Sequence, residues 1–211
     1  MLLVVTFLAG ELVFRERQNK LAEFVDAFPV KNWTVITSKL LALFGVIALV
    51  LIFCGISILI RQIQDDEISI EIGALFRGLV VIGVPLCFYA TLAFAMQVVV
   101  NNKYIAYLGL LLLISFNQLL RYLNFSQHYY QFGSMPTLPY SDLNGYGHYI
   151  VGWIWYAIYW TALSAVLIII ANAFWVRGSI SERRFTRKAE SFKFSKLRLL
   201  SLSFLFAVFA G

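Results

Sequence analysis

The side chains that could carry out catalysis or bind a metal are few in this sequence. A zinc peptidase of the His-Glu-x-x-His type needs two histidines one helical turn apart with a glutamate between them. His128 and His148 instead stand far apart, each without a neighbouring ligand. Ser141, Asp142 and His148 offer the residue types of a serine hydrolase, but their stretch, Ser-Asp-Leu-Asn-Gly-Tyr-Gly-His, is dense in turn-forming residues. We therefore expect turn and helix-capping roles for these residues, and no catalytic or metal site in this chain.

Any energy for work across a membrane is expected to come from another protein. The sequence has no Gly-x-x-x-x-Gly-Lys-Ser/Thr stretch, so we expect neither ATP nor another cofactor to bind to this chain. No ionisable residue lies in the middle of a long apolar run, which argues against a carrier driven by protons or ions. The polar residues inside those runs are expected to form hydrogen bonds between helices, and two of them are weaker candidates for lining a transport path: Asn117 and Gln118, beside Gln97, Thr161 and Asn172.

The composition is typical of a membrane protein that crosses the bilayer several times. Of 211 residues, 61% are hydrophobic and 13% are charged, which is about half the charged share of an ordinary globular domain. Four apolar segments are long enough to span a bilayer: residues 40–60, 78–100, 104–120 and 149–176. Two shorter apolar segments flank them, at residues 1–9 and 199–211, so the chain is interpreted as a piece of a longer protein.

The basic residues predict how the spans are oriented. The net charge is +6, and fourteen of the seventeen Lys and Arg residues fall in residues 10–39, 101–103 and 177–198. The four spans place these segments on one side of the membrane, and cytoplasmic loops are the ones enriched in Lys and Arg. That side is therefore predicted to be cytoplasmic, with residues 177–198 as a basic cytosolic linker, and the loop at residues 121–148 faces outward. Because the bases flank apolar spans, nucleic acid is not an expected partner.

Residues 11–28 are predicted to form a separate cytosolic helix that lies along the membrane. Its apolar stripe has helical spacing: Leu21, Phe24, Val25 and Phe28. Glu11 with Arg15, and Glu16 with Lys20, are spaced for ion pairs along one helix, and Pro29 ends it. The stripe places Glu16 on the solvent side, together with Arg17. Two interpretations remain open, a surface helix that only organises a loop and a docking surface for a cytosolic partner.

The same stretch resembles a known family. "GELVFRERQNKLAEFVDAFPVKNWTVITSKLLAL", residues 10–43, is similar to the cytosolic coupling segment of type-two (ABC-2) ABC exporter permeases. The similarity is greatest to bacterial ABC permeases fused to a C-terminal gluzincin-type, zinc aminopeptidase-like domain. Their Gly-Glu-Leu-Val opening is present at residues 10–13, and their Asp-Ala-x-Pro turn at residues 26–29. "QFGSMPTLPYSDLNGYGHYI", residues 131–150, resembles a further stretch of these proteins, with Phe132 in place of their usual Tyr.

The resemblance implies an all-α transmembrane helical bundle in a bacterial inner membrane. Residues 1–9 would end the second span of a six-span half, the four full spans would be the third to sixth, and residues 199–211 would begin a further span. A cytosolic ABC ATPase subunit would dock on the segment at residues 11–28, and the charged residues implied in that contact are Glu11, Arg15, Glu16, Arg17, Lys20, Glu23 and Asp26. A second permease half or dimer mate would complete the transporter. Two other readings remain open, a membrane anchor for an aminopeptidase-like domain beyond residue 211 and a sensor or scaffold.

The outward loop at residues 121–148 is the second region of interest. Its turn-forming residues predict a tightly bent segment, and its many Tyr and Trp residues are typical of an aromatic belt at the membrane interface. A lid over the transport path, or a seat for an outer domain, is the alternative. The residues singled out there are Tyr140, Asp142, Asn144, Gly145 and His148.

Overall fold

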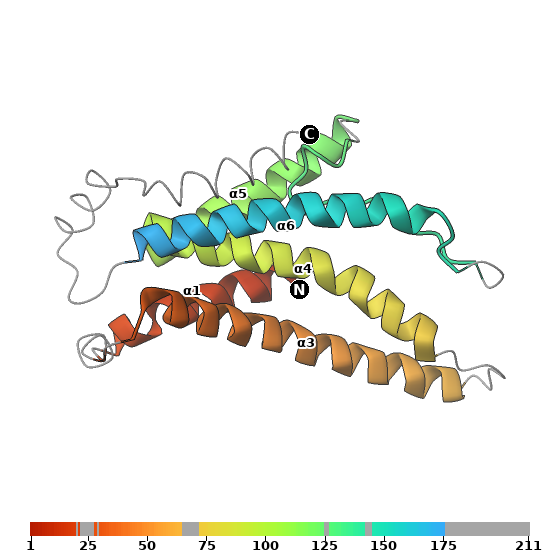
Figure 1. Cartoon of the computed structure of the whole chain (residues 1–211), viewed down its shortest axis with the longest axis horizontal. Coiled ribbons are helices and arrows are strands. Elements are labelled where there is room, and N and C mark those ends of the chain that lie inside the picture. Colours follow the sequence, from red (N-terminus) through yellow and green to blue (C-terminus); the bar gives the residue numbers. More distant parts are fainter. Residues whose placement is uncertain are drawn as a thin grey trace.

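The computed structural model describes residues 1–19, 21, 28, 30–64, 72–124, 127–141 and 145–175. Within these residues the chain is all-helical, as the sequence predicts, and an isolated β-bridge joins Ser141 to Gly145. The helices are α1 (Leu2–Gln18), α3 (Asn32–Gln64), α4 (Ile72–Val100), α5 (Lys103–Tyr122) and α6 (Tyr149–Phe174) (Figure 1). The predicted linker at residues 177–198 and the apolar segment at residues 199–211 lie outside the described residues.

Four of these helices have the length and composition of membrane spans. α3, α4, α5 and α6 contain 33, 29, 20 and 26 residues. At 1.5 Å per residue, about 20 residues cross the hydrocarbon core of a bilayer. The outward faces keep large apolar side chains accessible, and Leu41 and Phe53 of α3 are 68% and 67% exposed. Such a surface is suited to contact with lipid, and the prediction of a multi-helix membrane bundle is confirmed.

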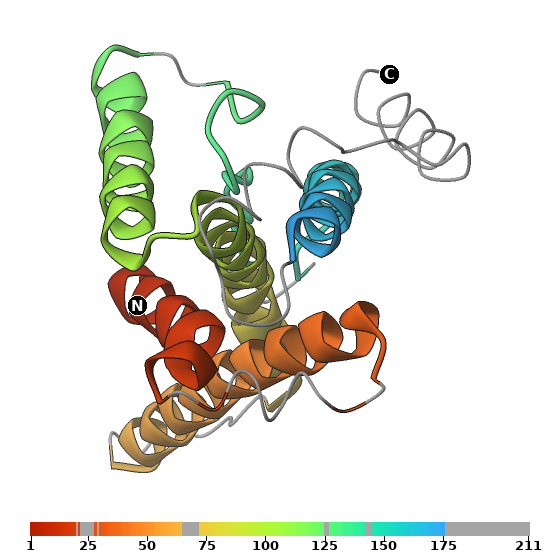
Figure 2. The same cartoon turned by 90° about the vertical axis from the view of Figure 1, so that its left-hand side faces the viewer.

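α4 is the central helix of the bundle. It contacts α1, α3, α5 and α6, and Figure 2, which looks along the bundle, shows these four helices around it. A helix that contacts other helices or lipid on every side needs apolar residues on every face, and the sequence of α4 supplies them. Its buried residues include Phe88, Phe94 and Val98. Helix α4 is therefore the element against which the other helices are positioned.

Two glycines allow α3 and α4 to pack closely. A Cβ atom on Gly55 of α3 would lie 2.9 Å from Leu79 Cδ1, and a Cβ atom on Gly83 of α4 would lie 2.7 Å from Leu51 Cδ1. The side chain of a leucine on each helix therefore packs directly against a glycine on the other helix. Small residues have this role at many helix interfaces in membranes, where close backbone approach maximises van der Waals contact.

The turn between α4 and α5 is fixed by two asparagines. Asn101 has a φ angle of 53°, in the left-handed region that Asn adopts more readily than most residues. Asn102 caps α5, because its side-chain oxygen accepts hydrogen bonds from the backbone N–H groups of Tyr104 and Ile105 at 3.1 and 3.3 Å. The turn places Lys103, the first residue of α5, near the end of α1.

The structure corrects the predicted boundary between residues 1–9 and the helix at residues 11–28. α1 runs without a break from Leu2 to Gln18. Val13 and Phe14 are buried in a core with residues of α3, α4 and α6, so residues 11–18 continue a helix of the bundle and do not lie along the membrane surface. The apolar residues that sequence reasoning places on a membrane-facing stripe start only after α1, where Leu21 and Phe28 are exposed and Phe24 and Val25 lie outside the described residues.

Candidate functional site

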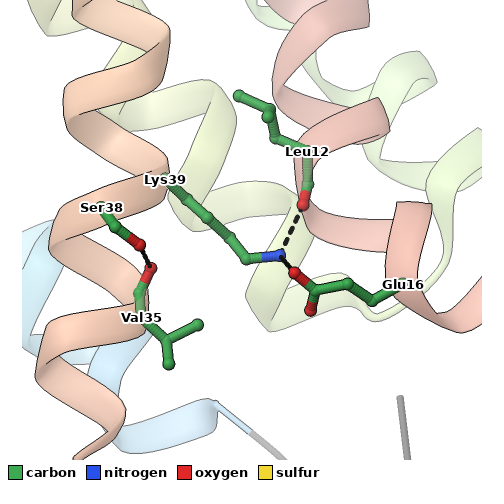
Figure 3. Close-up of polar contacts among 5 residues, drawn as sticks. All are labelled: Leu12, Glu16, Val35, Ser38 and Lys39. Atoms are coloured by element: carbon green, nitrogen blue, oxygen red, sulfur yellow. Dashed lines mark hydrogen bonds and ion pairs between the residues drawn. The ribbon is translucent and has the colours of Figure 1, made fainter. Parts of the chain in front are cut away.

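Lys39 of α3 connects three helices at one end of the bundle. Its Nζ atom donates a hydrogen bond to the backbone carbonyl of Leu12 at 2.7 Å and pairs with Glu16 Oε1 at 2.9 Å, both on α1 (Figure 3). Nζ also lies 5.4 Å from the centre of the Trp175 ring, directly after α6. Lys39 is 7% exposed, and a buried ammonium needs such partners because desolvation disfavours an isolated charge. We call these four residues the Lys39 cluster.

A second lysine, at the start of α5, attaches α5 to α1. Lys103 Nζ forms an ion pair with Glu11 Oε1 and lies 5.7 Å from the centre of the Phe7 ring. One turn further along α5, the Tyr107 hydroxyl donates a hydrogen bond to the carbonyl of Phe7 at 3.1 Å. Gly10 of α1 permits this approach, because a Cβ atom there would overlap the Tyr107 hydroxyl. The end of α1 is therefore attached to α3 by one ion pair and to α5 by another.

These ion pairs change the roles of two residues that the resemblance assigns to ATPase docking. The predicted pair of Glu11 with Arg15 is wrong, because Glu11 pairs with Lys103, 92 positions away along the chain. Glu16 faces solvent only in part, because its side chain is 34% exposed and pairs with Lys39. Arg15 is exposed. The remaining docking residues have no described side chain: Arg17, Lys20, Glu23 and Asp26.

A cavity of about 400 Å³ lies at the other end of the bundle, between α4, α5 and residues 133–138. Ligand sites in proteins commonly have volumes of about 300–1,000 Å³. The walls are largely apolar, from Val81, Ile82, Pro85, Leu86, Ile114, Met135, Pro136, Leu138 and Trp153. The polar groups that line it are Tyr89, Asn117, Gln118, Arg121, Ser134 and Thr137. We call it the Arg121 cavity, and both sequence candidates for lining a path, Asn117 and Gln118, belong to it.

Asn117 joins α5 to α4 and to the segment that follows α5. Its Nδ2 atom donates hydrogen bonds to the Tyr89 hydroxyl at 3.0 Å and to the carbonyl of Phe132 at 3.3 Å. The next residue, Gly133, has a φ angle of 67°, and a Cβ atom there would lie 2.8 Å from Tyr89 Cε2. Both the backbone angle and the close ring contact therefore require glycine. These contacts give the cavity a wall with a defined shape.

Arg121 lies at the exposed rim of the cavity, one residue before the end of α5. Its Nε atom donates a hydrogen bond to Gln131 Oε1 at 2.9 Å, and Gln131 is 3% exposed. The partial negative charge at a helix C-terminus stabilises a cation at this position. A guanidinium has five N–H donors, so the hydrogen bond to Gln131 leaves Arg121 able to bind an anion or a carbonyl group.

His128 and Trp160 hold the segment after α5 against α6. His128 Nδ1 lies 2.8 Å from Ser134 Oγ, and its ring meets the ring of Tyr156 edge-on with centroids 5.6 Å apart. Trp160 Nε1 donates a hydrogen bond to the carbonyl of Ser134 at 3.0 Å. Partial burial and, second, the positive charge of Arg121 lower the pKa of His128 below its ordinary value of 6.5.

The residues that sequence reasoning singles out in the loop before α6 do not line the Arg121 cavity, as far as they are described. Tyr140 contacts Tyr146 edge-on with ring centroids 5.4 Å apart. Gly145 has a φ angle of 58° and exchanges two backbone hydrogen bonds with Ser141, at 2.9 and 2.6 Å, which closes the tight turn expected there. His148 precedes α6 without a capping hydrogen bond from its side chain. Asp142 and Asn144 lie outside the described residues.

Gln97 differs from its expected role. It is fully buried in α4, and within the described part of the chain neither its Oε1 nor its Nε2 atom has a hydrogen-bond partner. Gln97 therefore does not form the interhelical hydrogen bond that the sequence predicts, within the described residues.

Sequence reasoning also missed Arg121 as a residue of the cavity. A usable signal was the spacing of Asn117, Gln118 and Arg121, because residues three and four apart share one face of a helix.

The fold and these sites define the class of protein. Four helices suited to span a bilayer, three of which pack around the fourth, α4, make this a multi-pass membrane protein. A family model described as "ABC-2 family transporter protein" matches residues 1–118, which is more than half of the chain. The chain belongs to this family and is a permease component of an ABC transporter, whose membrane part works together with an ABC ATPase. Comparisons with curated proteins and with solved structures gave no significant match.

Proposed function

We propose that this chain is the membrane-spanning part of an ABC exporter in a bacterial inner membrane, driven by a separate cytosolic ATPase that docks on residues 11–28. The observation that carries the proposal is the double attachment of α1 through Glu16–Lys39 and Glu11–Lys103. Membership of the ABC-2 family supports the need for an ATPase. The excess of Lys and Arg at this end of the bundle supports its placement in the cytosol.

The attachments suggest how movement at the docking segment would reach the membrane. The last turn of α1 and the residues after Gln18 would contact the ATPase, and α1 would carry their displacement into the bundle. Because α1 is tied to both α3 and α5, and packs on α4, these helices would move with it as a rigid body. Such a movement would alternate the access of the transport path. In this arrangement Glu11 and Glu16 hold α1 in place, and Arg15 is available for the ATPase.

Recovery of the ATPase with the purified permease tests the docking surface. Reversing the charges of Arg15 and Arg17 to Glu should lower recovery strongly, since misplaced like charges across an interface cost several kcal/mol. The control is Arg77→Glu, a charge reversal of the same kind at one position of α4, at the opposite end of the bundle. Recovery is normalised to the amount of permease. Equal recovery with both variants would contradict docking on residues 11–28.

The resemblance of residues 131–150 favours a second candidate, in which the spans mainly anchor a zinc aminopeptidase-like domain beyond residue 211. The two candidates predict different coding sequences downstream of residue 211 and next to the gene. A downstream His-Glu-x-x-His motif would support the anchor, and an adjacent ATPase gene would support transport. A transport assay with a catalytically inactive ATPase then separates them, because an anchor would not need ATP hydrolysis. A second permease half, or a second copy of the chain, would complete the transporter in the first candidate.

A further inference from the structure

We propose that the Arg121 cavity binds an amphipathic anion, a molecule with a hydrocarbon body and one anionic head, such as an anionic phospholipid. The head would lie beside Arg121, and the hydrocarbon body would lie between α4 and α5. The inference deepens the proposed function, because it gives a permease half of that kind a ligand class. Binding does not need the ATPase, so the two proposals can fail independently.

The distribution of polar and apolar groups along the cavity carries the inference. Arg121 lies at the rim and next to the end of α5, and Gln118 and Asn117 follow one turn deeper. Ile114 comes a further turn down the same face of α5. Going into the cavity along α5, the lining changes from the cation of Arg121 to amides and then to the aliphatic Ile114. This order matches a ligand that is charged at one end only. Because the cation is at the helix end, the head would lie at the depth of the bilayer interface.

The wall formed by α4 supports a hydrocarbon body. Val81, Ile82, Pro85 and Leu86 line the cavity on this side. Ile82 is 59% exposed and Gln118 is also exposed, so the cavity is open between α4 and α5 on the side that faces lipid. A wholly polar ligand would leave this wall without contacts, and a neutral apolar ligand would leave the charge of Arg121 unused.

The guanidinium of Arg121 favours an anionic ligand. Arg121 donates to the neutral Gln131, so its positive charge is not cancelled by that contact. Arg121 therefore favours an anionic head over a cationic one.

Photocrosslinking in lipid nanodiscs tests the proposal on the full chain. The probe is phosphatidylglycerol with a photoreactive group in its acyl chain, present as a small fraction of phosphatidylcholine. Mass spectrometry measures crosslinks at residues 81–89 relative to those on the lipid-facing surface of α3 around Phe53. This ratio should be about tenfold higher than with the matching phosphatidylcholine probe, whose phosphate is balanced by its own choline cation; a tenfold preference corresponds to roughly 1.4 kcal/mol.

Two Arg121 variants, one control variant and one competitor test where the head of the lipid lies. Arg121→Gln should abolish the preference for phosphatidylglycerol and Arg121→Lys should keep most of it, whereas Arg77→Gln, the same loss of charge outside the cavity, should not change it. Soluble glycerol phosphate should compete poorly, because it lacks the hydrocarbon body. Equal ratios for both lipid probes in the unmodified protein would overturn the proposal without any variant. Competition by glycerol phosphate as strong as that of the lipid would also overturn it, because the site would then bind a free anion.

Discussion

The ion pair between Glu16 and Lys39 predicts an unequal response to removal of its two charges. Lys39 is 7% exposed, whereas the Glu16 side chain is 34% exposed. Glu16→Gln removes the negative charge beside a buried ammonium, which keeps the Leu12 carbonyl, the Trp175 ring and at most a neutral amide oxygen as partners. Lys39→Met leaves a carboxylate that water can reach and puts a flexible apolar side chain among apolar neighbours. Removal of the carboxylate should therefore be the more damaging change.

The expected magnitudes follow from burial. Loss of one partner of a fully buried ion pair costs about 3–5 kcal/mol. Because water reaches Glu16 and screens the pair, the free energy of unfolding should fall by roughly 1–3 kcal/mol in Glu16→Gln. Lys39→Met should lower it by less than about 1.5 kcal/mol. The double variant should be close to Lys39→Met alone, because the buried charge that Glu16→Gln leaves unpaired is no longer present.

Equilibrium unfolding in mixed detergent, followed by tryptophan fluorescence, measures these differences. Lys31→Met is the matched control, because Lys31 is exposed just before α3, and this variant should unfold like the unmodified protein. If Lys39→Met proved more destabilising than Glu16→Gln, burial would not decide the energetics of the pair. If the double variant showed the sum of both losses, the two side chains would not be coupled, and the rigid attachment of α1 to α3 would lose its support.

Three further predictions follow from single features of the chain. With the native cysteines replaced, a cysteine at Ser141 should react with an impermeant reagent in intact cells and one at Ser181 should not; labelling of Ser181 alone would reverse the predicted orientation. Gly133→Ala should reduce stability by at least about 1–2 kcal/mol in thermal unfolding, from the left-handed φ angle alone, and an unchanged transition would contradict the close contact with Tyr89. Because the pKa of His128 is lowered in the folded state, its contribution to stability should be complete above pH 6.5 and decline below it; His128→Gln should lack this decline, and parallel pH profiles of the two proteins would refute the prediction.

Local properties of the chain were enough to predict the class of fold. A run of about 20 apolar residues forms a helix in a bilayer because each backbone group must be hydrogen-bonded within its own segment. The segments at residues 40–60 and 104–120 therefore appear as α3 and α5, although both helices are longer in the structure. The backbone of Gly145, with its left-handed φ angle and its two hydrogen bonds to Ser141, was also predictable in kind, because Gly favours such turns.

Helical spacing was a poor guide to the partners of the charged residues. Ion pairs four residues apart on an exposed helix contribute only about 0.3–0.5 kcal/mol, so a lysine from another helix readily replaces them. Glu11 and Glu16 contact lysines that are 92 and 23 positions away along the chain. No local pattern could indicate that Val13 and Phe14 would join a core and carry these acids into the bundle.

The sequence by itself determined that this is a helical membrane protein, because hydrophobic length and the hydrogen-bonding needs of the backbone act within each segment. Only the tertiary structure decided that Lys39 is buried among α1, α3 and the end of α6. It likewise decided that Arg121, Asn117 and Tyr89 surround one cavity. Those arrangements depend on how four helices pack around α4, and packing is set by contacts between residues far apart in the chain, which spacing along one helix does not encode.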